Sequence, residues 1–171
     1  MIIVCPLSDL PKAIREDRPS AVVSLLSPHQ MIPEIHTYAD GRHLRLEMED
    51  VSEIRRGEKG PAQEHVTKLL DFVSQWDRSA PIIIHCWAGI SRSTAAALIT
   101  QCALRPDVDE AELAAELGAV APHAKPNPLL AQYADDILGR GGRLARAAES
   151  IWTDMSVYEG YRFYYPIDGG S

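Results

Sequence analysis

The stretch IIIHCWAGISRSTAAA, residues 82–97, decides how this chain folds and where its chemistry lies. Three consecutive isoleucines (Ile82–Ile84) are typical of a central strand that is buried on both faces. From Arg92 onward the residues are small or apolar almost all round, which predicts a buried helix. Between the strand and the helix lies a short loop that follows Cys86 and contains Gly89. The stretch therefore predicts a strand–loop–helix unit at the centre of an α/β domain.

The loop after Cys86 has the features of a site for a tetrahedral oxyanion. At a helix N-terminus the first backbone N–H groups lack intrahelical partners, and the helix dipole adds partial positive charge. A loop wrapped into that end points successive N–H groups at one centre, and Gly89 lets the backbone pass close to the anion. Arg92, six positions after the cysteine, carries a planar guanidinium that can bind two oxygens of a phosphate. The same positive groups favour the thiolate form of Cys86.

These parts predict a covalent reaction at a phosphate ester. The thiolate of Cys86 would attack phosphorus to give a cysteinyl-phosphate, which water would then cleave. Ser93 is placed to donate a hydrogen bond to the sulfur as it leaves, and His85 is expected to order the loop by hydrogen bonding rather than to transfer protons. The loop backbone and the guanidinium would hold the equatorial oxygens. The predicted phosphate-binding residues are Trp87, Ala88, Gly89, Ile90, Ser91 and Arg92.

The run HCWAGISRS, residues 85–93, resembles the signature of the cysteine-dependent protein tyrosine phosphatases, which is His-Cys, five residues, Arg, then Ser or Thr. Gly89 and the strand–loop–helix context agree with that signature. The length of the chain and its overall pattern are similar to compact, dual-specificity-like members of the superfamily, of the small bacterial type. The resemblance implies a hydrolase for phosphomonoesters that works without a metal or a cofactor.

The resemblance also implies a general acid, usually an aspartate, on a separate loop upstream of the cysteine. A carboxylic acid in that position can protonate the oxygen of the leaving group. Asp50, in LEMEDVSE, lies 36 positions before Cys86 and directly after a predicted strand. We therefore expect Asp50 to be the acid, with Glu49 as the second candidate and Asp40 as the third.

The order of predicted elements favours an α/β fold. Strands are expected at residues 2–5, 21–26, 43–48 and 82–84, and helices at residues 8–16, 61–76, 92–104, 110–117, 128–138 and 143–152. Ser8, Pro61 and Asp109 are the expected starts of three of these helices. A central, mostly parallel sheet flanked by helices, with a helical C-terminal part, fits this order. We expect a single phosphatase domain over residues 1–152 and an aromatic-rich C-terminal tail over residues 153–171, whose tyrosines are expected to pack.

Composition sets limits on partners and location. A chain of 171 residues with 46% hydrophobic and 24% charged residues is typical of one soluble globular domain. The net charge of −7, without a basic cluster, makes nucleic acids and anionic membrane surfaces poor partners. No apolar run approaches the ~20 residues of a membrane span, and the start, MIIVCPLSDLPKAI, does not resemble a signal peptide. We expect a cytoplasmic protein that acts on a phosphorylated protein or peptide; its oligomeric state is left open.

The three cysteines, Cys5, Cys86 and Cys102, are too widely spaced to indicate a disulfide framework or a zinc site. Free cysteine is among the most buried residue types, so a place in the core is the alternative for Cys86 and the expected role of the other two. One of those two could also protect oxidised Cys86 through a disulfide. His123 and Asn127, in PHAKPNP, are candidates for the rim of the site.

The leading hypothesis is a phosphoprotein phosphatase for phosphotyrosine, and dual specificity is an option that the loop does not decide. Two alternatives stay open: a phosphopeptide-binding pseudophosphatase, and a phosphatase for a non-protein phosphomonoester. Phosphoinositide phosphatases tend to carry lysines inside the loop, whereas WAGIS, residues 87–91, carries no charge. This difference favours a singly phosphorylated substrate.

Overall fold

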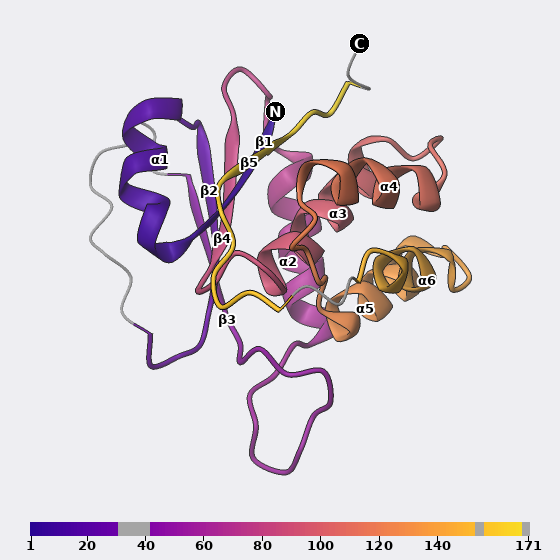
Figure 1. Cartoon of the computed structure of the whole chain (residues 1–171). Helices are drawn as coiled ribbons and strands as arrows, with labels where there is room; N and C mark the ends of the chain where they lie inside the picture. The colour runs from indigo at the N-terminus through magenta and orange to yellow at the C-terminus, as the bar shows by residue number, and fades with distance from the viewer. Residues whose placement is uncertain (31–41, 153–155, 169–171) are drawn as a thin grey trace.

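A five-stranded sheet forms the centre of the molecule (Figure 1). The structure is a computed structural model that describes residues 1–30, 42–152 and 156–168. Its strands are β1 (Ile2–Pro6), β2 (Ala21–Leu26), β3 (His43–Glu47), β4 (Ile82–Cys86) and β5 (Phe163–Tyr165). They lie in the order β3-β2-β4-β1-β5, with the first four in sequence parallel and β5 antiparallel to β1. The mostly parallel sheet that the sequence predicts is therefore confirmed.

Helices cover both faces of the sheet, but unequally (Figure 1). On one face, the short 3-10 turn η1 (Leu7–Asp9) leads into α1 (Leu10–Asp17), whose buried side chains pack on the strands. The other face is covered by α2 (Gln63–Ser74), α3 (Arg92–Leu104), α4 (Glu110–Val120), α5 (Pro128–Leu138) and α6 (Arg143–Ser150). None of the helices in the described ranges is both long and apolar enough to cross a membrane. The helical C-terminal part is as predicted.

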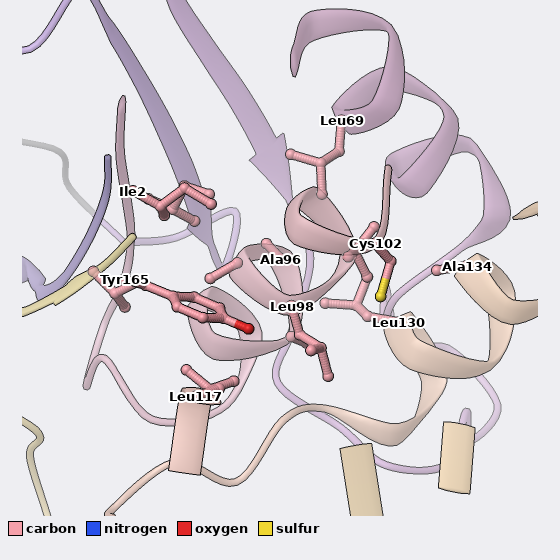
Figure 2. Close-up of a cluster of buried hydrophobic side chains, with 14 of the residues drawn as sticks. Ile2, Leu69, Ala96, Leu98, Cys102, Leu117, Leu130, Ala134 and Tyr165 are labelled. Carbon is pink, nitrogen blue, oxygen red and sulfur yellow. The ribbon is translucent and has the colours of Figure 1, made fainter. Parts of the chain in front are cut away.

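The strand and helix on either side of the Cys86 loop are the most deeply buried elements. β4 is buried at each of its residues because β1 and β2 flank it and helices cover both of its faces. In α3 the residues from Arg92 to Cys102 are buried, and its alanines let the helix pack close to the sheet. Figure 2 shows part of this core, where Leu98 of α3, Leu130 of α5 and Tyr165 of β5 belong to one cluster. The loop is thus held between two rigid elements.

The four parallel strands end at one edge of the sheet, and the site is built there. Leu7, Ser27, Met48 and Trp87 are the residues that follow β1, β2, β3 and β4. Since β5 runs in the opposite direction, the residues that precede it reach the same edge. Ligands of open α/β sheets bind outside the carboxyl ends of the strands. Five segments that are far apart in sequence therefore converge around the loop after Cys86.

Two predicted helix starts are wrong. The hydroxyl of Ser8 does not cap α1; it donates a hydrogen bond to Glu159 Oε1, and the helix begins at Leu10. Pro61 precedes α2 instead of opening it, because the extended backbone of Ala62 is the N-cap and its N–H donates to His65 Nδ1 at 3.0 Å.

The cap of α4 is as predicted, but three helix ends differ from the sequence pattern. The carboxylate of Asp109 accepts a hydrogen bond from Ala111 N at 2.8 Å. α4 then continues through Gly118 to Val120, and α6 ends at Ser150. α2 ends at Ser74, before Trp76, which is buried nonetheless and donates from Nε1 to Ser20 Oγ at 3.0 Å.

The aromatic segment near the C-terminus contains an edge strand that the sequence does not predict. β5 pairs with β1 over Ile2–Val4, and two of its own side chains, Phe163 and Tyr165, are buried. The hydroxyl of Tyr165 donates to Leu113 O at 2.6 Å, which satisfies this buried polar group. Packing therefore accounts for two of the aromatic residues in this segment.

Candidate active site

Cys86 lies at the carboxyl end of β4 with only 1% of its surface exposed. Its Sγ atom lies 3.1 Å from Ser93 Oγ and accepts a hydrogen bond from the backbone N–H of Gly89 at 3.3 Å. Both groups can donate to sulfur, so both stabilise a negative charge on it. Ser93 thus occupies the position in which a hydroxyl can assist a thiolate that leaves.

The backbone of the loop is turned so that its N–H groups face inward. The carbonyls of four of its residues accept hydrogen bonds from segments outside the loop: Leu7 N–H to Trp87 O at 3.1 Å, Gly160 N–H to Ala88 O at 2.8 Å, Lys125 N–H to Ile90 O at 2.9 Å and Asn127 N–H to Ser91 O at 3.2 Å. In a planar trans peptide the N–H points opposite to the carbonyl of the same unit. With the carbonyls bound outward, the N–H groups form the concave nest that binds an oxyanion.

Gly89 is required in this loop for two reasons. Its φ is +71°, a left-handed conformation that side chains rarely adopt. A Cβ atom at this position would also lie 2.8 Å from Pro6 N and 3.1 Å from Cys5 C, which are backbone atoms of β1. The loop can therefore sit against the end of β1 only with glycine here.

Arg92 is buried at the start of α3 and is held along one edge of its guanidinium. Nη1 donates to Met48 O at 2.8 Å and lies 3.4 Å from Ser27 Oγ. Nε is buried and has no hydrogen-bond partner; the nearest carboxylate oxygen, Asp50 Oδ2, lies 3.8 Å away. A buried N–H donor of a charged group that makes no hydrogen bond costs free energy. The arrangement leaves Arg92 Nε available for an anion in the nest.

Asp50 reaches the loop from the segment that follows β3. Its Oδ1 atom accepts hydrogen bonds from Ser91 Oγ at 2.7 Å and from Asn127 Nδ2 at 3.0 Å. The side chain is 37% exposed, so the carboxyl group is accessible from solvent. Of the three acid candidates, Asp50 makes these contacts; Glu49 donates its backbone N–H to Lys59 O in its own loop. Asp40 lies outside the described residues.

His85 is fully buried in β4, one residue before the cysteine. Its Nε2 atom lies 2.5 Å from Ser24 Oγ on β2, and the same hydroxyl lies 2.7 Å from His43 Nε2 on β3. Burial lowers the pKa of His85 to about 3, and the charge of Arg92 acts in the same direction. A neutral imidazole that links three strands positions the loop and does not transfer protons near neutral pH.

The other two cysteines lie outside the Cys86 loop and are buried. Cys5 pairs in register with His85, and it belongs to the cluster on the α1 face, whereas Cys86 belongs to the cluster on the α3 face. Cys102 lies ten residues beyond Arg92 in α3, about 15 Å along the helix at 1.5 Å per residue. Burial raises the pKa of Cys102 to about 12 and raises the pKa of Cys5 as well. Both are core thiols, and a disulfide with Cys86 would require the backbone to move.

Sequence reasoning understated two contributions to the site. Asn127 was expected at the rim, but it is 98% buried and joins Asp50, Ser91 and α5. The pair Asn127-Pro128 is a strong N-cap signal, yet its bond to Asp50 depends on tertiary structure. Gly160 was not expected near the site at all. A Cβ there would lie 2.5 Å from His123 Nε2, so this glycine lets the C-terminal segment close on the loop.

Comparisons with known proteins agree with this geometry. Residues 57–115, which include the loop, match the family model described as Protein-tyrosine phosphatase. None of the curated protein sequences matches the chain. The family match covers α2, β4, α3 and the first part of α4, which is the strand–loop–helix unit with its flanking helices.

Solved structures extend the likeness to most of the chain. A structure of DUSP15 has a TM-score of 0.63 at 18% identity, covering 90% of this chain and 94% of that one. The human tyrosine phosphatase-like serine/threonine/tyrosine-interacting protein has a TM-score of 0.63 at 14% identity, covering 82% and 92%. PTPMT1 in complex with PI(5)P has a TM-score of 0.61 at 16% identity, covering 82% and 94%. The family model therefore supports the resemblance of the loop region to protein-tyrosine phosphatases, and the solved structures show that most of the chain shares the fold of compact phosphatases of this kind.

Proposed function

We propose that this chain is a cysteine-dependent phosphatase that hydrolyses phosphotyrosine in proteins, with Cys86 as the nucleophile. The observation that carries the proposal is the convergence of four groups on one loop. Cys86 Sγ lies at the base of the nest beside Ser93 Oγ at 3.1 Å, and Arg92 Nε, at its wall, has no hydrogen-bond partner. Asp50 is fixed above the loop by Ser91. A buried structural cysteine would need none of these partners.

In the first step, the thiolate of Cys86 attacks phosphorus opposite the leaving oxygen. The S–P bond forms while the P–O bond to the tyrosine oxygen breaks, and the protonated carboxyl group of Asp50 gives its proton to that oxygen. The N–H groups of the loop and the guanidinium of Arg92 hold the three equatorial oxygens, where charge is spread in the transition state. The products of this step are the dephosphorylated tyrosine residue of the substrate protein and cysteinyl-phosphate.

In the second step, water attacks the phosphorus of the cysteinyl-phosphate. The carboxylate of Asp50 takes the proton of the water as the P–O bond forms, which restores the acid for the next turnover. The S–P bond breaks, and the sulfur leaves as a thiolate that Ser93 Oγ and Gly89 N–H stabilise. Inorganic phosphate then leaves the nest. The sequence of steps needs no metal ion.

A phosphopeptide-binding protein without activity is the alternative from another functional class. The fold alone does not distinguish an enzyme from a binding protein. One structure with this fold is the human tyrosine phosphatase-like serine/threonine/tyrosine-interacting protein. The contacts of Asp50 favour the enzyme. A binding protein needs the anion nest alone. Asp50 is held at the mouth of the nest, with Oδ1 2.7 Å from Ser91 Oγ. The negative charge of this carboxylate weakens the binding of an anion, so its position is useful only if it serves as an acid.

The substrate class is inferred from the charge of the loop. Residues 87–91 carry no charged side chain, so the nest offers its N–H groups and one guanidinium to a single phosphate. A structure of PTPMT1 was solved with the lipid PI(5)P, so the fold also accommodates phosphoinositides. The acidic balance of the chain, with a net charge of −7, favours a protein substrate over an anionic membrane surface.

Hydrolysis of p-nitrophenyl phosphate tests the proposal. The wild type should release p-nitrophenol, and Cys86→Ser should reduce the rate to background. Cys102→Ser is the matched control, because it removes an equally buried thiol outside the loop and should retain activity. A phosphotyrosine peptide and a soluble phosphoinositide should then be compared by kcat/KM. A wild type no faster than Cys86→Ser would contradict the enzyme, and a higher kcat/KM for the phosphoinositide would contradict the substrate class.

A further inference from the structure

A pocket of about 520 Å³ opens beside the phosphate-binding loop, on its β1 side. Three segments line it: η1 and the start of α1 with Leu7 and Pro11, the start of the loop with Trp87 and Ala88, and the segment before β5 with Tyr158 and Glu159. Its volume is within the range of ~300–1,000 Å³ that is usual for ligand pockets. Because Trp87 directly follows Cys86, the pocket begins next to the nucleophile.

The wall that the C-terminal segment provides is firmly anchored. Gly160 N–H donates to Ala88 O at 2.8 Å, which ties the segment to the loop itself. Two residues further on, Arg162 makes ion pairs with Asp9 at 3.1 Å, Asp17 at 2.9 Å and Glu16 at 2.5 Å in the η1–α1 region. Its side chain is only 14% exposed, so this network is more than a loose surface contact. The pocket is therefore built before a ligand binds.

The surface of the pocket is apolar, with one negative charge at its edge. Trp87 is 55% exposed and Tyr158 fully exposed, so two large aromatic side chains present uncovered surface on either side. Glu159, which accepts a hydrogen bond from Ser8, is the charged residue among the described residues that line the pocket. Such a surface gains from burying an apolar group and repels a second phosphate.

We propose that this pocket binds an aromatic or apolar side chain of a phosphopeptide, next to the phosphorylated residue that occupies the nest. The inference rests on the proposed function and names the sequence context that the enzyme selects. An extended peptide rises about 3.3 Å per residue, so a side chain one or two positions from the phosphotyrosine reaches the pocket. The charge of Glu159 disfavours a phosphoinositide ring that carries further phosphates.

Peptide binding to Cys86→Ser tests the pocket without requiring turnover. Fluorescence anisotropy would measure the Kd of labelled phosphotyrosine peptides that differ only in the flanking residues, which are phenylalanine, serine or glutamate. We expect the phenylalanine peptide to bind about tenfold more tightly than the serine peptide, in keeping with the burial of one aromatic side chain, and the glutamate peptide to bind most weakly. Inositol 5-phosphate serves as the non-peptide phosphomonoester.

Substitutions in the C-terminal segment locate the effect. In the Cys86→Ser background, Tyr158→Ala should remove most of the preference for phenylalanine. Tyr164→Ala is the matched control: Tyr164 is a tyrosine of the same segment, 45% exposed and outside the pocket, and its loss should leave the preference intact. Tyr158 is fully exposed, whereas Tyr164 donates a hydrogen bond to Asp17 Oδ1 at 3.1 Å. Thermal unfolding should therefore show that both variants are folded, with Tyr164→Ala the less stable of the two.

Each outcome decides the proposal. Equal Kd values for the three peptides, a preference that survives Tyr158→Ala, or tighter binding of inositol 5-phosphate than of every peptide would overturn it. Failure of the proposed function is separate, because it would be seen in the wild type as an absence of p-nitrophenyl phosphate hydrolysis. A flanking preference in Cys86→Ser that depends on Tyr158 supports the pocket even in that case.

Discussion

The side-chain amide of Asn127 donates one hydrogen bond to Asp50 Oδ1 and one to Val51 O, each at 3.0 Å. Its carbonyl oxygen accepts from Leu129 N and Leu130 N, which caps α5. One buried side chain therefore fixes the acid candidate to a rigid helix. A carboxyl group on a loop becomes an efficient acid only when its position is defined to within hydrogen-bond distance of the leaving oxygen.

Asn127→Ala should lower kcat because it releases Asp50, in addition to the cost of a lost helix cap. The cap alone is worth ~1 kcal/mol of unfolding free energy. Asp109→Ala is the control, since Asp109 caps α4 through Ala111 N and lies away from the site. Urea unfolding should show a loss for both variants, larger for Asn127→Ala because its buried side chain also bonds Asp50 and Val51. Steady-state kinetics should show a fall in kcat for Asn127→Ala alone. Equal kcat values would mean that Asn127 is structural only.

Asp50→Asn should slow the reaction in proportion to the basicity of the leaving group. A missing general acid costs about 10²–10⁴-fold when the leaving oxygen must be protonated, so phosphotyrosine should suffer strongly and p-nitrophenyl phosphate much less. Glu49→Gln removes the neighbouring carboxylate and should retain nearly full activity on both substrates. If the loss appears in Glu49→Gln instead, the acid is Glu49.

Gly89→Ala should damage the phosphate nest, whereas Gly139→Ala should affect stability alone. Both glycines have positive φ, +71° and +64°, and an added methyl group costs ~1–2 kcal/mol in that conformation. At Gly139 the methyl group would meet no atom within 4 Å, but at Gly89 it would meet the backbone of β1 at 2.8 Å. We expect at least about tenfold weaker inhibition by orthovanadate in Gly89→Ala. Unchanged inhibition would show that the loop tolerates a different conformation.

The stability of the protein should depend on pH through His85. Its pKa is about 3 in the folded protein and ordinarily about 6.5. Above pH 6.5 both states are neutral at this residue, and the contribution is zero. As the pH falls from 6.5 toward 3, the unfolded state takes up a proton that the folded state does not, so stability falls by up to ~1.4 kcal/mol per pH unit.

His85→Gln should remove that part of the pH dependence. The variant loses stability at every pH, since it disturbs the bond to Ser24 on β2, but its slope between pH 6.5 and pH 4 should be shallower than that of the wild type. Urea midpoints measured across this range would compare the two slopes. Parallel curves would mean that other groups account for the acid sensitivity.

Local signals in the sequence were sufficient for the elements that hold the loop. The run Ile82–Ile84 predicts a buried strand before a helix as apolar as 92–104, and Asp109 marks a helix start through its own side chain. Cys86, the proposed nucleophile, and Arg92 flank the same short loop. Their proximity could therefore be predicted without knowledge of the tertiary structure. Asp50 could be proposed because the family resemblance implies an acid upstream of the cysteine and Asp50 directly follows a predicted strand.

Long-range contacts could not be read from the sequence. Serine often caps helices, but the hydroxyl of Ser8 donates its hydrogen bond to Glu159, 151 positions away. β5 is three residues long, and its pairing with β1 leaves no periodic pattern. For the same reason the contact of Gly160 with Ala88 was not foreseen. These contacts build the pocket beside the nest, which is why specificity was harder to predict than the proposed nucleophile.

Trapping the phosphorylated intermediate tests the central claim most directly. The wild type, mixed with a phosphotyrosine peptide and quenched rapidly in acid, should carry one phosphoryl group, and peptide mass spectrometry should locate it on the fragment that contains Cys86. Cys86→Ser, treated in the same way, should carry none on that fragment. A phosphoryl group on another residue, or hydrolysis that continues in Cys86→Ser, would contradict a mechanism in which Cys86 is the nucleophile.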